Sequence, residues 1–61
     1  MTTIQLDISH ECTLEEVKEF ADQFNCTFEL VVEFGPGGGN PVYEFTGSLE
    51  DIQGMEKEYW N

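Results

Sequence analysis

The chain has 61 residues, enough for one domain and too few for a second. Thirteen acidic residues against two lysines give a net charge of −11, which excludes direct binding to nucleic acid and to anionic membranes. No apolar run approaches the ~20 residues that cross a bilayer, two cysteines are too few for a disulfide scaffold, and no signal peptide opens the chain. We therefore expect a single cytoplasmic domain, 1–61, with reduced thiols.

The first half of the chain predicts a strand followed by a helix. Residues 3–9 alternate between apolar and polar, with two isoleucines and a leucine on one face, which is the pattern of a half-buried strand. A helix is expected over about 14–24, because Thr13 and Glu16 have the spacing of a capping box and the apolar residues that follow share one side. Asn25 tolerates the left-handed conformation that ends helices.

The second half predicts two strands and a second helix. Alternation from Phe28 to Phe34 and again over 42–46 favours two strands, and the glycine- and proline-rich stretch 35–41 between them favours an antiparallel hairpin with a long, mobile tip. That stretch lacks the lysine and the following helix of a phosphate-binding loop. Ser48 is then positioned to cap a helix that ends near Trp60.

The order strand, helix, strand, strand, helix predicts an α+β fold, with a three-stranded sheet and both helices packed on one face. A right-handed crossover makes the first two strands parallel, and the third strand then lies between them. This layout resembles a ferredoxin-like fold that lacks its last strand. The apolar faces of the elements predict a core that contains Val17, Phe20, Phe24, Leu30, Val32, Phe45 and Ile52.

One cluster brings together residue types that act in catalysis or bind metals: His10, Glu11 and Cys12, with Cys26 farther along the chain. A cysteine nucleophile needs a nearby histidine, and structural zinc needs four ligands with recognisable spacing. A structural interpretation is simpler: Cys12 packs at the helix start, Cys26 fills a core edge, and His10 lies in a loop. We therefore expect no enzymatic activity, no metal and no cofactor.

Acidic residues form two candidate partner-binding surfaces. On the first surface, acidic residues recur every three or four positions along one side of the first helix. The second surface is the outward face of the sheet, where valines lie among the acidic residues. We also expect Asp7 on that outward face. The helical set is Glu11, Glu15, Glu19 and Asp22, and the sheet set is Glu29, Val31, Glu33, Val42 and Glu44.

These surfaces favour a non-enzymatic protein that binds the basic surface of another protein. Rows of carboxylates can occupy a site built for phosphates, so an inhibitor that mimics a nucleic-acid backbone is the sharpest form of this hypothesis. In size and charge the chain is similar to small acidic inhibitors encoded by phages and other mobile elements. Two alternatives stay open: an assembly module that pairs with itself or a partner through an exposed strand edge, or with itself through the open sheet face, and a charge that serves only solubility.

Overall fold

A computed structural model describes residues 1–33 and 39–60 of the chain. The elements follow in the predicted order, as β1 (Thr2–Asp7), α1 (Leu14–Gln23), β2 (Thr27–Val32), β3 (Val42–Gly47) and α2 (Leu49–Trp60). The α+β prediction is confirmed. Residues 34–38, which include most of the predicted hairpin tip, lie outside the described residues.

Hydrogen bonds from side chains set the helix ends. The hydroxyl of Thr13 accepts from the Glu16 amide at 3.2 Å, and the Glu16 carboxylate accepts from the Thr13 amide at 3.1 Å, so the predicted capping box starts α1. Asn25, at φ 54°, turns the chain out of α1. At the start of α2, the Ser48 hydroxyl accepts from the Asp51 amide at 3.2 Å.

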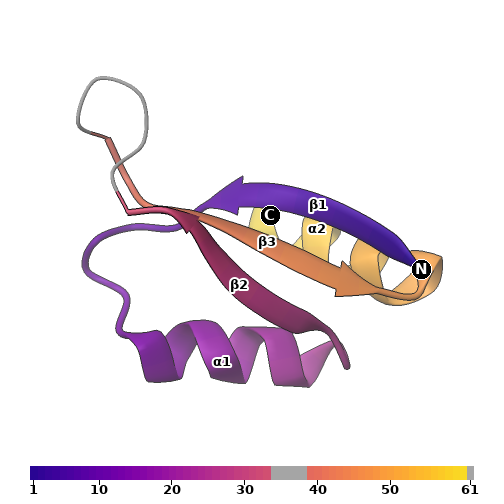
Figure 1. Ribbon diagram of the computed structural model, residues 1–61. Coiled ribbons are helices and arrows are strands. Elements are labelled where there is room, and N and C mark those ends of the chain that lie inside the picture. Colours follow the sequence, from indigo (N-terminus) through magenta and orange to yellow (C-terminus); the bar gives the residue numbers. More distant parts are fainter. Residues whose placement is uncertain (34–38, 61) are drawn as a thin grey trace.

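The sheet has the strand order β1-β3-β2, and β3 is antiparallel to both neighbours, so β1 and β2 are parallel. The hairpin strand therefore lies in the middle, as predicted. Figure 1 shows α1 running along β2, and α2 behind β1 and β3. Buried residues of both helices and of the inward side of the sheet form a single cluster, so both helices cover the same face and leave the other face open.

The core is centred on β3. Phe45 is fully buried, and Ile52 and Met55 of α2 and Val17 and Ala21 of α1 close over it. Burial of Val17, Phe45 and Ile52 confirms part of the predicted core. The remaining buried apolar residues are Leu6, Cys26 and Tyr43, and the predicted core residues Phe20 and Phe24 are only partly buried at its border, where their rings meet edge to face.

The prediction that Leu30 and Val32 lie in the core is wrong, because both residues are exposed. The register explains Val32. Leu30 lies opposite Tyr43 and Val32 lies opposite Val42, so Val31 is an extra residue in β2 and forms a bulge. One inserted residue reverses the side on which every later residue lies, and Val32 therefore shares the outward face with Val42. Leu30 keeps its inward position in the register but lies on an edge strand.

Candidate functional site

The open face of the sheet carries a pair of glutamates on neighbouring strands. Glu29 of β2 lies directly opposite Glu44 of β3, and on the other side of Glu44 lies Gln5 of β1, whose amide donates to the Glu44 carboxylate at 3.3 Å. Both lysines of the chain, Lys18 and Lys57, lie on the helices, which cover the other face. The two carboxylates therefore face solvent without a lysine of their own chain beside them.

Valines adjoin this glutamate pair. The bulge turns Val31 and Val32 into exposed residues, and Val32 is the register partner of Val42. Glu33 follows them as an exposed residue just beyond the end of β2. Glu29, Val31, Val42 and Glu44 of the predicted sheet set therefore lie on the open face, and Val32, which the alternation pattern had assigned to the core, joins them, whereas the bulge reverses the alternation before Glu33.

The acidic set on the first helix is less uniform than its spacing suggests. Glu15 and Glu19 are exposed on α1, whereas Glu11 lies in the turn before it, where its amide donates to the Ser9 hydroxyl at 3.2 Å. Asp22 forms an ion pair with Lys18 at 3.1 Å. Because Lys18 lies on the same exposed side, it offsets part of the negative charge of this surface.

The two acidic surfaces face opposite directions. Val17 and Ala21 point from α1 into the core, so Glu15 and Glu19 point away from the sheet on the far side of the helix. Glu29 and Glu44 lie on the sheet face that the helices leave open. A single flat partner surface cannot reach both sets at once, so each has to be considered as a separate site.

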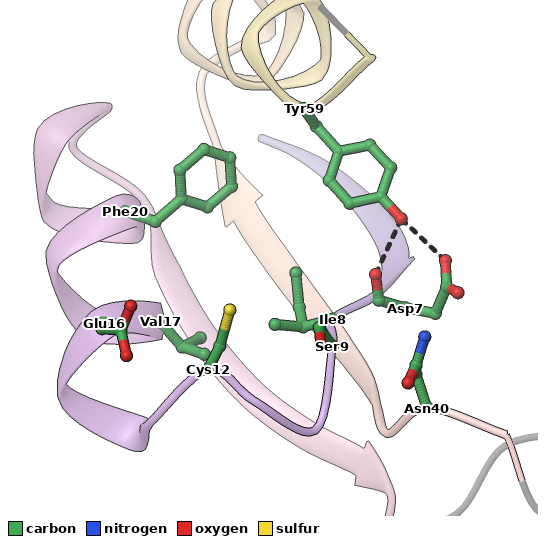
Figure 2. Close-up of a pocket in the computed structure, with 9 residues that line it drawn as sticks. All are labelled: Asp7, Ile8, Ser9, Cys12, Glu16, Val17, Phe20, Asn40 and Tyr59. Atoms are coloured by element: carbon green, nitrogen blue, oxygen red, sulfur yellow. Dashed lines mark hydrogen bonds between the residues drawn. The ribbon is translucent and has the colours of Figure 1, made fainter.

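A pocket of about 470 Å³ opens on the helical side, at the carboxyl end of β1. Figure 2 shows Cys12 and Phe20 on one side of it and Asp7 and Tyr59 on the other. The remaining lining residues are Ile8, Ser9, Glu16, Val17 and Asn40. Asp7 thus borders this pocket, although its register partner, Val42, lies on the open sheet face where Asp7 was predicted.

Asp7 and Tyr59 are joined by two short hydrogen bonds. The Tyr59 hydroxyl donates to the backbone carbonyl and to the carboxylate of Asp7, both at 2.7 Å. Donation by Tyr59 lowers the pKa of Asp7, with smaller contributions from the Asp7 backbone and from Asn40. Burial, followed by the bond to Asp7 and its charge, raises the pKa of Tyr59 to about 12. The pair therefore fixes the end of α2 to the end of β1.

The two cysteines and His10 lie near the two ends of α1. Both cysteines are free, and Cys26 is buried while Cys12 is exposed. Burial, and secondarily the charge of Asp51, raises the pKa of the Cys26 thiol, which donates to the Phe24 carbonyl at 3.3 Å. His10 lies in the turn before α1. Across 1–33 and 39–60, no three His, Cys, Asp or Glu side chains are grouped as a metal site.

Sequence reasoning found the acidic residues but missed the pocket. Asp7 and Tyr59 are 52 positions apart, and no motif links them. The one signal in the sequence was an acid at the end of a strand together with a tyrosine on the apolar side of the last helix, and only the topology brings them together. Neither described helix has the length and apolar character that crossing a membrane requires.

Comparison of the chain with protein-family models, with curated proteins and with solved structures finds no match.

Proposed function

We propose that this chain is a non-enzymatic binding protein whose open sheet face engages a basic surface on a protein partner. The observation that carries the proposal is the pair Glu29 and Glu44, two carboxylates in direct register beside exposed valines. Like charges in direct register destabilise a sheet, and a cation placed between them removes that repulsion. An arginine or lysine from a partner supplies such a cation.

The valines give this face the composition of a protein interface. Interfaces combine an apolar centre with charged groups around it, and here Val31, Val32 and Val42 provide the apolar part. The partner of this proposal is a basic or nucleic-acid-binding protein, and the chain acts as an inhibitor by occupying a site that otherwise holds phosphates. The exposed acids of α1 add to the long-range attraction.

An arginine-rich peptide bound to a short labelled DNA duplex tests the proposal. The chain should displace the duplex, and raising the salt concentration should weaken its affinity for the peptide. E29Q/E44Q should weaken binding about tenfold, whereas E15Q/E19Q, which removes the same charge from α1, should change it by less than about threefold. Equal losses in the two variants would mean that only net charge matters, and a larger loss in E15Q/E19Q would move the site to α1.

Substitution of Val31 by Ser separates an interface with an apolar centre from a purely charged mimic. Val31 is exposed at the bulge, so its replacement leaves the core unchanged. An interface centred on the valines should lose affinity for the peptide, while a surface that acts only through its carboxylates should keep it. A control substitution, Leu14→Ser, changes an exposed apolar residue on α1 and should leave binding unaltered.

A second candidate function is favoured by a different observation. Within the described part of the chain, β1 pairs with β3 alone, so its other edge is open. An open edge offers unpaired backbone groups to another strand. We propose strand-edge assembly, with a second copy or with a partner, as the alternative to the acidic interface.

A further inference from the structure

The open edge of β1 lacks the features that usually prevent strands from pairing. Thr2 to Leu6 are all uncharged, with no proline, lysine or bulge, in a chain with fifteen charged residues. The amide of Ile8 donates to the Pro41 carbonyl at 2.9 Å, which fixes the alternation: Ile4 and Leu6 direct their backbone groups to β3, and Thr3 and Gln5 direct theirs to the open edge.

The flank of α2 beside this edge carries two exposed apolar residues. Leu49 and Trp60 are 58% and 74% exposed, and they lie on one side of the helix because they are eleven residues apart. Gln53 and Glu56 lie between them on the same side. Gly54 marks the opposite flank, since a Cβ there would meet the Phe24 ring of α1 at 3.5 Å. The apolar flank therefore faces away from α1, toward the open edge of β1.

We infer that a second copy of the chain covers this surface, with the two β1 strands pairing antiparallel to give one six-stranded sheet. The inference rests on the second candidate function and names its occupant. β1 and α2 run in the same direction, because Thr2 lies opposite Gly47 near the start of α2 and Asp7 bonds to Tyr59 near its end. A two-fold axis through the middle of β1 therefore places β1 and α2 of the second copy antiparallel to β1 and α2 of the first. Each copy contributes the same surface, so the interface is self-complementary.

Dimensions agree with this arrangement. The six residues of β1 span about 17 Å, and Leu49 and Trp60 are also about 17 Å apart along α2. One axis therefore passes near the midpoint of both, and it sets Leu49 of each copy against Trp60 of the other. Strands lie about 4.8 Å apart, and α2 packs equally over β1 and β3, so the two α2 axes lie about 10 Å apart, within packing distance.

Charge explains why a second copy is tolerated in spite of the net charge of −11 on each. Along β1 and the stripe from Leu49 to Trp60, Asp7 and Glu56 are the two ionisable side chains, and the Asp7 carboxylate accepts a hydrogen bond from Tyr59 of its own chain. The acids Glu29 and Glu44 lie on the open sheet face, and Glu15 and Glu19 lie beyond α1. Repulsion between copies therefore acts at long range, where salt screens it, and salt should strengthen the dimer.

Sedimentation analysis across a range of protein concentrations and salt concentrations tests the inference. The parent should pass from a 7.0 kDa monomer to a dimer, at lower protein concentration when salt is raised. This dependence is opposite to that of binding to a basic partner, so the two proposals fail separately. A monomer at millimolar protein and high salt would overturn the inference, and a dimer that dissociates as salt rises would also overturn it.

Two leucines form a matched pair of variants. Leu49 and Leu14 are each the first residue of a helix, at 58% and 64% exposure, so both can be changed without disturbing the core. Leu49→Glu should weaken the dimer more than about tenfold, because the axis places the change at the interface twice, whereas Leu14→Glu should have little effect. Equal effects of the two substitutions would contradict the proposed surface.

Amide hydrogen exchange identifies the strand. In the dimer the amides of Thr3 and Gln5 should become protected as protein concentration rises, while Ile4 and Leu6, already bonded to β3, should be protected throughout. Rapid exchange of Thr3 and Gln5 in a sample that sediments as a dimer would show that the copies meet elsewhere.

Discussion

The two edges of the sheet differ although both flank the same central strand. On β2, a bulge follows Leu30 and the acidic Glu29 faces solvent, and each of these features hinders pairing with a further strand. On β1, the register with β3 is regular from Thr2 to Asp7 and the first five residues are uncharged. The two edges of one sheet can thus have separate roles. Here the β2 edge is protected from pairing with a further strand, and the β1 edge is open to it.

Burial beneath the two edges differs in the same direction. Leu6 of β1 and Leu30 of β2 both lie opposite Tyr43, one on each side of β3. Leu6 is 7% exposed and Leu30 is 46% exposed. The helices therefore cover the β1 side of the sheet more completely at this level, and the stability of the domain depends more on the strand with the open edge.

Replacing each leucine by alanine tests this difference and should give the largest effect. Leu6→Ala should lower the free energy of unfolding by about 2–5 kcal/mol, and Leu30→Ala by less than about 1 kcal/mol, because only Leu6 leaves a buried cavity. Urea denaturation of both variants measures the difference. Equal destabilisation would show that β2 is covered as fully as β1.

The contrast between these leucines also shows where sequence reasoning stops. Alternation gave Leu6 and Leu30 the same inward direction, and the register confirms that direction for both. What alternation cannot give is the position of a helix above a strand, which decides whether an inward residue is buried. The bulge is likewise set by pairing between strands, so the outward position of Val32 had no local signal.

Local signals, by contrast, predicted the helix ends, and the right-handed crossover rule predicted the strand order. The Thr13 and Glu16 pair, Asn25 and Ser48 act within a few residues of themselves, and each behaves as predicted. The acidic candidates were found because charge is visible in sequence. Their division between the first helix and the outward face of the sheet was also predicted, and the structure adds that the two surfaces face opposite directions.

The next prediction concerns Gly47, the last residue of β3, which lies beside the starts of β1 and β2. Gly47 lies opposite Thr2 of β1 and against Cys26, the residue before β2, so an added Cβ would be 2.7 Å from the Cys26 sulfur. Gly47→Ala should therefore destabilise the fold by about 1–3 kcal/mol. Gly54→Ala is the control, because its Cβ has ordinary contacts and alanine favours a helix by up to about 1 kcal/mol. Thermal unfolding of the two variants should shift in opposite directions.

The far end of β1 carries a pH-dependent contact that β2 lacks. Because the fold lowers the pKa of Asp7, its stabilisation is complete above the ordinary value of 3.8 and disappears as pH falls through the lowered value. Because the fold raises the pKa of Tyr59 from 10.0 to about 12, its stabilisation is complete below 10.0 and disappears as pH rises toward 12.

Tyr59→Phe removes both contributions together. The melting temperature of the variant should lie a few degrees below that of the parent between about pH 4 and pH 10, and the gap should narrow on either side of that range. Melting curves of the two proteins over pH 2–12 provide the measurement. A gap that stays constant across this range would mean that the hydroxyl contributes through packing and not through its bonds to Asp7.

The smallest expected effect concerns Glu44, whose neighbour is uncharged on β1 and acidic on β2. On the β1 side Glu44 accepts a hydrogen bond from Gln5, and on the β2 side it faces Glu29. Glu29→Gln should therefore stabilise the free protein by about 0.2–1 kcal/mol, and Gln5→Glu should destabilise it by a similar amount. High salt should reduce both differences, because it screens the repulsion.

The same substitution connects stability to the proposed interface. If a basic partner neutralises the Glu29 and Glu44 pair, Glu29→Gln should raise the melting temperature of the free chain and weaken its binding to the arginine-rich peptide. Glu15→Gln removes one charge from α1, where Lys18 already offsets part of the negative charge, and should alter binding less than Glu29→Gln does. A Glu29→Gln chain that is more stable and binds the peptide as tightly as the parent would show that the glutamate pair destabilises the sheet but takes no part in the interface.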